Sequence, residues 1–170
     1  NRGTGCRLLA GIEVDILADG SLGLPDRVLA DLDLVVASVH SGLHEGKDLM
    51  TRRILTAISN EHVDILGHPT GRLLPGRPAI ELDMDRVLDG ARAAGTALEI
   101  NASPYRMDLD DPHIREARDR GVSLAIGTDA HSRAELGHMG HGVTLARRGW
   151  CGQGDILNTL VREALLRWAS

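Results

Sequence analysis

The sequence predicts an α/β fold in which short parallel strands alternate with helices, and two kinds of segment predict it. Short apolar, often β-branched runs recur along the 170 residues, with the length and continuity of parallel strands that are buried on both faces. Amphipathic segments with helix start and stop signals lie between them. This alternation is typical of a parallel sheet. The predicted strands are Arg7–Ile12, Leu34–Val39, Val63–Leu66, Ala97–Ile100 and Ser123–Ile126.

The segments between and after these runs carry the helical signals. Apolar residues recur at helical spacing in the first of them, and Gly95 and Gly121 are the stop signals of the next two. The last segment is expected to be one amphipathic helix or a pair. The predicted helices are Lys47–Ser59, Asp85–Ala94, Asp111–Arg120 and Asp155–Trp168.

Two segments are predicted to lie outside regular structure. Pro69–Ala79 is rich in Gly, Pro and Arg, so we expect a long functional loop there. Gly137–Gly142 contains several glycines and is predicted to be flexible. The first residue is Asn1 rather than Met, and an apolar run follows almost at once. We therefore expect a segment of a longer protein.

Composition narrows the class of protein. Hydrophobic residues make up 42% and charged residues 25%, which is ordinary for a soluble domain. The net charge of −5 argues against a broad basic face for nucleic acid. No apolar run approaches the roughly 20 residues that cross a bilayer, so we expect no membrane partner. Cys6 and Cys151 are far apart, which suggests free thiols and a cytoplasmic location.

Metal-type side chains follow the predicted strands at the points where the strands end. The carboxyl ends of parallel strands meet at one edge of a sheet or barrel, where active sites are assembled. A single histidine at a strand end is more often a structural residue, but a whole set at one rim favours a site. The residues are Glu13, His40, His68, Asn101, Asp129 and His131.

The types of these residues indicate divalent-metal chemistry. Imidazole and carboxylate together suit Zn²⁺, Mn²⁺ or Fe²⁺, and a carboxylate can bridge two cations. Such a pair activates water near neutral pH and clamps phosphoryl oxygens. Ser38 and Ser41 flank His40 without a nucleophile elbow, and no phosphate-binding loop of the GxxxxGK[ST] type is present.

Five ordered motifs make the sequence recognisable. They are GIEVDI (11–16), SVHS (38–41), GHPTGRLL (67–74), LEINASPYRMDL (98–109) and GTDAH (127–131). Together they resemble the PHP (polymerase and histidinol phosphatase) domain, over nearly the whole chain. HPTGRLL, the INASPYRMDL stretch and GHGVTLARRGW (140–150) favour the type found at the carboxy terminus of bacterial family-X DNA polymerases.

The resemblance implies a fold and a set of ligands. The family fold is a distorted (β/α)7 TIM-like barrel with up to three metal ions, Mn or Zn with Mg possible, at the carboxyl ends of its strands. Glu13 matches the carboxylate that bridges two metals, and His40 and His68 match further ligands of one of them. Asp129 matches a ligand of the other bridged metal, and His131 matches a ligand of the third.

The family also uses an amino-terminal His-x-His motif, then an Asp and another His, and no histidine precedes His40 here. We therefore expect residues 1–170 to be a partial PHP domain that lacks the first strands. Alone, it would be weak or inactive, because two metals would keep too few protein ligands. Half a barrel would also expose an unpaired sheet edge, so we expect aggregation or rescue by partner strands.

Several other polar residues have two readings that the sequence leaves open. Arg72 and Arg106 could bind substrate phosphate or form structural salt bridges. Asn101 could orient a ligand or close a turn. Asp15 is expected to support its strand end rather than bind metal, and Arg147–Arg148 to be a solvated pair rather than a DNA contact.

Five histidines fall outside the family's ligand positions. The glycines around two of them, at i, i+3 spacing, make a stable helix doubtful, so a separate metal site is rejected there. The residue nearest the ligands is expected to be a solvated loop residue rather than a substrate contact. These histidines are His44, His62, His113, His138 and His141.

The resemblance implies a metal-dependent phosphoesterase. We expect a 3′→5′ exonuclease and 3′-end-processing module of a family-X DNA polymerase in DNA repair, with DNA 3′ ends and an upstream polymerase domain in cis as partners. The alternatives are a phosphatase of small phosphate esters, as in the histidinol-phosphatase branch, and a non-catalytic structural PHP module. Intact metal-type residues argue against the structural module, because buried polar groups are costly.

Overall fold

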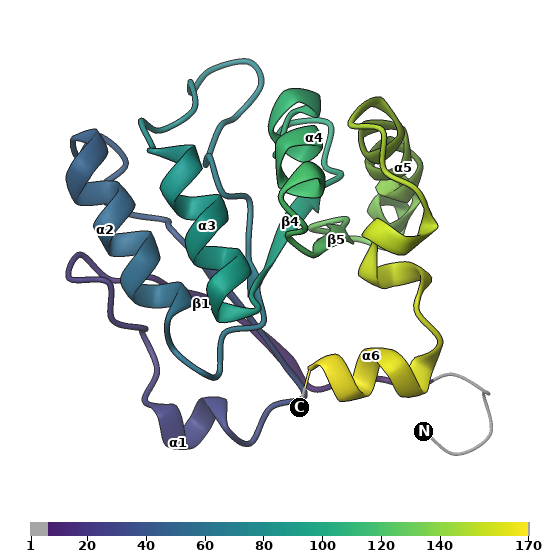
Figure 1. The fold of residues 1–170 in the computed structure, drawn as a ribbon, viewed down its shortest axis with the longest axis horizontal. Helices are drawn as coiled ribbons and strands as arrows, with labels where there is room; N and C mark the ends of the chain where they lie inside the picture. Colours follow the sequence, from purple (N-terminus) through teal and green to yellow (C-terminus); the bar gives the residue numbers. More distant parts are fainter. Residues whose placement is uncertain (1–6, 170) are drawn as a thin grey trace.

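The computed structural model describes residues 7–169, in which a five-stranded parallel sheet has the order β1-β2-β3-β4-β5 (Figure 1). The strands are β1 (Gly11–Asp15), β2 (Leu34–Ser38), β3 (Ile65–Leu66), β4 (Ala97–Asn101) and β5 (Leu124–Gly127). The α-helices are α1 (Asp26–Leu29), α2 (Lys47–Ile58), α3 (Met84–Ala94), α4 (Asp111–Asp119), α5 (Met139–Arg148) and α6 (Arg162–Trp168). The 3₁₀ helices are η1 (Ala134–His138), η2 (Gln153–Asp155) and η3 (Leu157–Thr159). The predicted α/β class is confirmed.

The first strand lies further along the chain than its apolar run predicts. The run Arg7–Ile12 is mostly outside β1, which pairs in register from Gly11 opposite Leu34 to Asp15 opposite Ser38. Glu13 is therefore within the strand rather than after it. The reason is tertiary, because pairing with β2 decides the bounds of the strand and the period of two sets the face of each side chain.

Capping explains where two helices begin. The Asp83 side chain accepts a hydrogen bond from the Arg86 amide at the start of α3, and Gly95 follows α3 in the left-handed conformation. Asp110 caps α4 in the same way through the His113 amide. These contacts satisfy backbone groups that a helix end leaves unpaired. The predicted Asp155–Trp168 helix is broken into η2, η3 and the short α6.

The prediction that Gly137–Gly142 is flexible and non-helical is wrong. The segment spans the end of η1 and the first turn of α5. A Cβ at Gly142 would lie 2.4 Å from Cγ2 of Ile126 and 2.9 Å from Cβ of Ala102. Glycine therefore permits close packing of α5 on the sheet, and this packing outweighs its low helix propensity.

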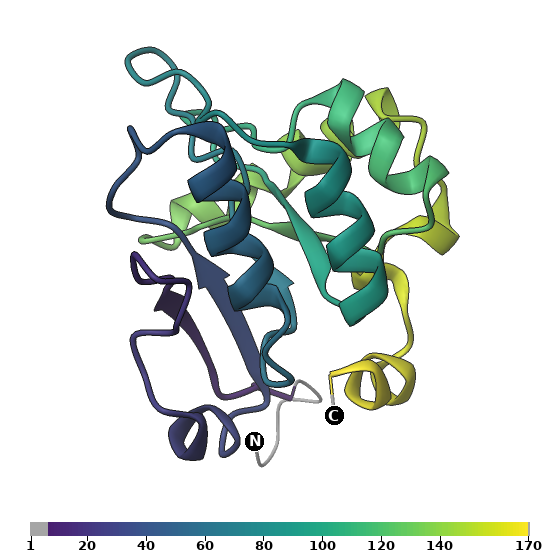
Figure 2. The same ribbon diagram turned by 60° about the vertical axis from the view of Figure 1, so that its left-hand side comes forward.

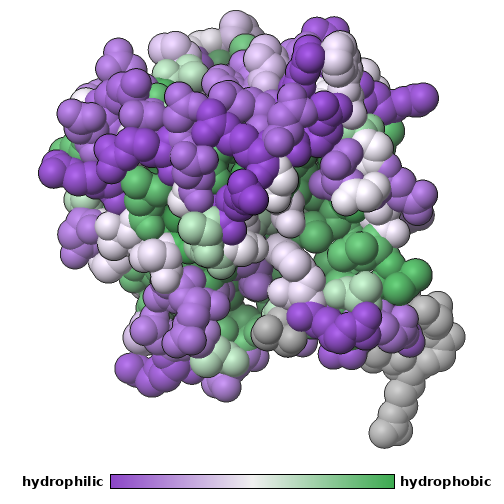
Figure 3. Space-filling model, in the orientation of Figure 1, coloured by the Kyte–Doolittle hydropathy of each residue, from purple (hydrophilic) through white to green (hydrophobic). Residues whose placement is uncertain are grey.

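The two faces of the sheet are covered differently. Helices α2, α3, α4 and α5 stand side by side against one face, and the main apolar core lies between them and the strands (Figures 1 and 2). On the other face a small second cluster joins Ile65, Ala97 and Ala125 to Leu157, with Trp168 of α6 packed against it. Figure 3 shows the helix-covered side as mostly hydrophilic, with apolar side chains in view beside the C-terminal segment.

One buried arginine holds two strand ends together from outside the sheet. The Arg53 side chain, in α2, is 1% exposed. Its guanidinium donates to the carbonyl oxygens of Ile16 and Leu17, just after β1, and of Ser41, after β2. These bonds fix the segments that follow the two strands, and both strands lead into the candidate site.

No helix among residues 7–169 is both long and apolar enough to cross a membrane. Cys151 is a free thiol, whereas Cys6 lies outside the described residues.

Candidate metal centre

Three residues from neighbouring strands converge at the carboxyl edge of the sheet. Glu13 lies in β1, His40 follows β2 and His68 follows β3. One ligand atom of each lies within 4.8 Å of those of the other two, and this is the only such group of His, Cys, Asp and Glu in the described part of the chain. Adjacent parallel strands end at the same edge, so the order of the sheet brings these three together.

The Glu13 carboxylate is the centre of this group. Its Oε1 atom is 2.9 Å from Nε2 of His68 and 3.4 Å from Nε2 of His40. The hydrogen bond with His68 lowers the pKa of Glu13 to about 2. Burial alone would lower the pKa of His68, but its hydrogen bond to Glu13 and nearby carboxylates leave it raised. Without metal, the two form an ion pair in which a proton stands where a cation would bind.

Asp15 orients His40. Its Oδ1 atom is 2.6 Å from Nδ1 of His40, so that nitrogen donates to the carboxylate. The Nε2 atom, which faces Glu13, is then free of its proton and available to a cation. The expectation that Asp15 supports the site rather than binds metal agrees with this geometry.

The backbone around His68 is built for close approach. A Cβ at Gly67 would lie 2.3 Å from Oγ of Ser38, so only glycine fits before His68. His68 itself has φ 25° and Asp129 has φ 50°, both left-handed for residues with side chains. Such backbone conformations cost about 1–3 kcal/mol each and concentrate at functional sites.

Asp129 shares a small cavity with this group. The cavity has a volume of about 80 Å³ and is lined by Glu13, Val36, His68, Glu99, Asn101 and Asp129. Asn101 donates to Oδ2 of Asp129 at 3.2 Å and accepts from the Ser103 amide at 3.0 Å. Asn101 therefore both orients a candidate ligand and closes a turn. His131 differs, because its side chain is 84% exposed and its Nδ1 lies 2.9 Å from the Asp129 carbonyl oxygen.

The two arginines have different surroundings. The Arg72 guanidinium donates to the carbonyl oxygens of Arg106 and Met107 and lies 3.6 Å from Asp110, so it clamps the loop after β4. Nε of Arg106 donates to Oδ2 of Asp129 at 3.1 Å, while its Nη1 is buried without a hydrogen-bond partner. Arg106 thus keeps a donor in reserve beside the candidate centre.

The remaining histidines do not join the group. His113 pairs with Asp110 at the start of α4. His138 and His141 stack with ring centroids 5.7 Å apart, and although their segment is helical they have no third ligand among the described residues. Arg148 contacts Asp111 at 2.8 Å.

The donor set fits a divalent cation. Two imidazole nitrogens and a carboxylate oxygen on one cavity wall are suitable ligands for Zn²⁺, Mn²⁺ or Fe²⁺. The Nδ1 atom of His68 is buried without a partner, which shows a ligand group whose bonding is incomplete in the protein alone. When bound, such a cation would polarise a phosphoryl oxygen and lower the pKa of a water molecule.

Sequence reasoning missed one residue at the site. Glu99 stands in the middle of β4 between two apolar neighbours, and its carboxylate reaches the cavity wall. The available signal was a charged residue inside an otherwise buried strand, two positions before Asn101.

The fold and the site define an α/β protein with a candidate metal centre at the carboxyl edge of a parallel sheet. Over 152 residues the chain is 47% identical to the DNA polymerase/3′-5′ exonuclease PolX of Bacillus subtilis, covering 89% of this chain and 27% of that protein. It is 32% identical over 165 residues to a probable phosphatase of Thermoanaerobacter sp., covering 91% and 65%. For a probable phosphatase of Caldanaerobacter subterraneus, the values are 34% over 167 residues, 92% and 63%.

The chain therefore belongs to the PHP family and is homologous to part of PolX, which confirms the resemblance seen in its motifs. It spans about a quarter of the length of PolX and just under two thirds of the two phosphatases. No family model matches the chain.

Proposed function

We propose that this chain is the carboxy-terminal part of a PHP-type phosphoesterase domain that processes DNA 3′ ends within a family-X DNA polymerase. The observation that supports the proposal most is the convergence of Glu13, His40 and His68 within 4.8 Å. In this proposal residues 1–170 supply part of a barrel, the upstream polymerase acts in cis, and the whole protein works in cytoplasmic DNA repair.

The residues have distinct roles in the proposed reaction. Glu13, His40 and His68 hold one Mn²⁺ or Zn²⁺ ion, with Mg²⁺ as a further option. Asp129 and His131 contribute to neighbouring metal positions that need ligands from outside this chain. A bound cation would supply activation of water and neutralisation of charge at phosphorus.

Substrate contacts are proposed for the basic residue beside Asp129. The free Nη1 donor of Arg106 would meet a phosphoryl oxygen by a charge-assisted hydrogen bond. Asn101 acts through Asp129, and Arg72 acts by holding the loop that carries Arg106.

The test is cleavage of a 3′-recessed duplex with Mn²⁺ by the natural protein that carries this sequence. The double replacement His40→Ala and His68→Ala should abolish cleavage. The matched control is His62→Ala with His113→Ala, two histidines outside the group, which should leave the rate close to that of the wild type. Equal cleavage by the wild type and the first variant would remove the proposal.

A phosphatase of small phosphate esters is the second candidate, because two relatives are named probable phosphatases. The same variants assayed on a phosphate monoester and on the duplex separate the two, since the preferred substrate shows the larger kcat/KM. Loss of neither activity would favour the structural PHP module.

A further inference from the structure

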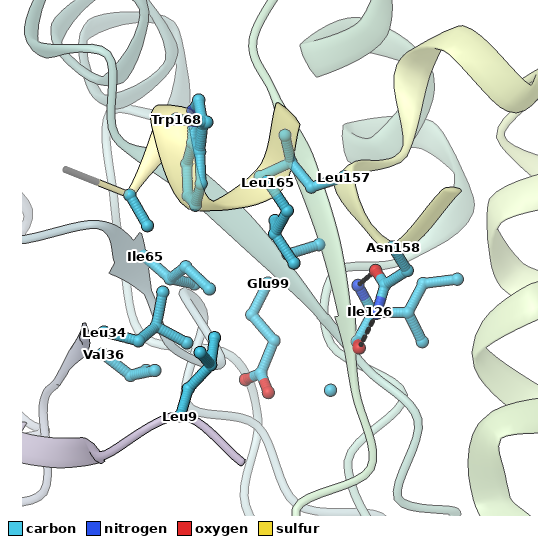
Figure 4. A pocket seen from close by; sticks show the side chains of 13 residues that line it. Leu9, Leu34, Val36, Ile65, Glu99, Ile126, Leu157, Asn158, Leu165 and Trp168 are labelled. Carbon is cyan, nitrogen blue, oxygen red and sulfur yellow. Dashed lines mark hydrogen bonds between the residues drawn. The ribbon is translucent and has the colours of Figure 1, made fainter. Parts of the chain in front are cut away.

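Glu99 occupies an unusual place for a carboxylate. It lies in the middle of β4 on the sheet face opposite α2–α5, between the 80 Å³ cavity of the metal centre and a larger apolar pocket of about 230 Å³. Figure 4 shows its carboxylate beside Leu9, Leu34 and Val36 at one end of that pocket. No ion pair links it to Lys or Arg within residues 7–169, so burial raises the pKa of Glu99 to about 7.

The contacts of this carboxylate lead to two candidate ligands. Its Oε2 accepts the backbone N–H of His68 at 2.7 Å and one N–H of the Asn101 side chain at 3.2 Å. The other N–H of that amide meets Asp129 at 3.2 Å. The Ser103 amide can only donate, so the Asn101 oxygen must face it and the nitrogen must face the two carboxylates.

The surroundings leave room for this connection and depend on it. His68 has φ 25°, and its amide is held by the Glu99 side chain after β3 has ended. A Cβ at Gly127 would lie 2.1 Å from Oε1 of Glu99, so glycine at this point of β5 makes space for the carboxylate. A charged group against an apolar pocket costs free energy unless its contacts repay it.

We propose that Glu99 is a positioning residue of the metal centre, which holds His68 through its backbone and Asp129 through Asn101. The inference rests on the proposed metal site and adds a residue that binds no metal itself. Residues that support metal ligands in this way contribute about 10- to 100-fold in metal affinity.

The experiment is calorimetric titration of the natural protein with Mn²⁺. Glu99→Leu, which suits the apolar pocket, should weaken binding by about 10- to 100-fold and speed hydrogen exchange at the His68 amide. Glu99→Gln keeps an acceptor oxygen and should restore most of the affinity. Thr96→Val is the matched control, because Thr96 is a buried polar residue of the same region that bonds only to the carbonyl oxygens of Ile58 and Val63.

The outcomes separate this inference from the proposed function. Wild-type Mn²⁺ affinity in Glu99→Leu, or an equal loss in Thr96→Val, would overturn the positioning role while the metal site stands. A wild-type protein that binds no Mn²⁺ would overturn both. Should Glu99→Leu not fold, Asn101→Ser interrupts the same connection and should weaken Mn²⁺ binding, and unchanged affinity there would overturn the inference.

Discussion

Replacing Arg53 by Met should loosen the segments that carry the metal-site residues of β1 and β2. The three carbonyl oxygens of Ile16, Leu17 and Ser41 would lose their donor, while the apolar stem of the side chain would be kept. Each hydrogen bond to a charged group contributes about 1.5–3 kcal/mol, and part of the total is offset because a buried charge is removed. The expected loss is therefore about 3–5 kcal/mol.

Hydrogen exchange read by mass spectrometry measures this loss locally, as the opening free energy of amides in α2 and in the segments after β1 and β2. Arg52→Met is the matched control, since Arg52 precedes Arg53 in the same helix but is exposed and makes no side-chain contact within residues 7–169. It should change the opening free energy by less than about 0.5 kcal/mol. Equal effects of the two variants would refute the reasoning.

Four other outcomes follow from the site. Asp15→Asn should weaken Mn²⁺ binding by about 10- to 100-fold in calorimetry, because the hydrogen bond that orients His40 is lost; unchanged affinity would contradict this. Mn²⁺ binding should release protons and weaken as pH falls through the raised pKa of His68, above 6.5, because the proton competes with the cation. Calorimetry in buffers of different ionisation enthalpy measures that release, and none should be absent. Gly127→Ala should destabilise the domain by about 1–3 kcal/mol in urea unfolding, because its Cβ would overlap Glu99. The isolated 170-residue chain should aggregate or recruit partner strands, and a monodisperse monomer with a sharp melt in light scattering and calorimetry would argue against this.

The sequence by itself determined the α/β class and most of the candidate site. Apolar runs and helix signals alternate along the chain, and these local patterns carry enough information to place most elements. Because parallel strands end at a common edge, the position of Glu13, His40 and His68 near strand ends was sufficient to predict their convergence. Chemistry of the ligands and order of the motifs did the rest.

Only the tertiary structure decided which polar groups meet. Pairing with β2 moved the first strand onto Glu13, and close packing on Ile126 made a helix of a glycine-rich segment. The contrast between Arg72, which clamps a loop, and Arg106, which faces Asp129, depends on contacts between residues far apart in sequence. The same holds for Glu99, whose hydrogen-bond partners come together only when β3, β4 and β5 lie side by side, since no local pattern encodes a contact across strands.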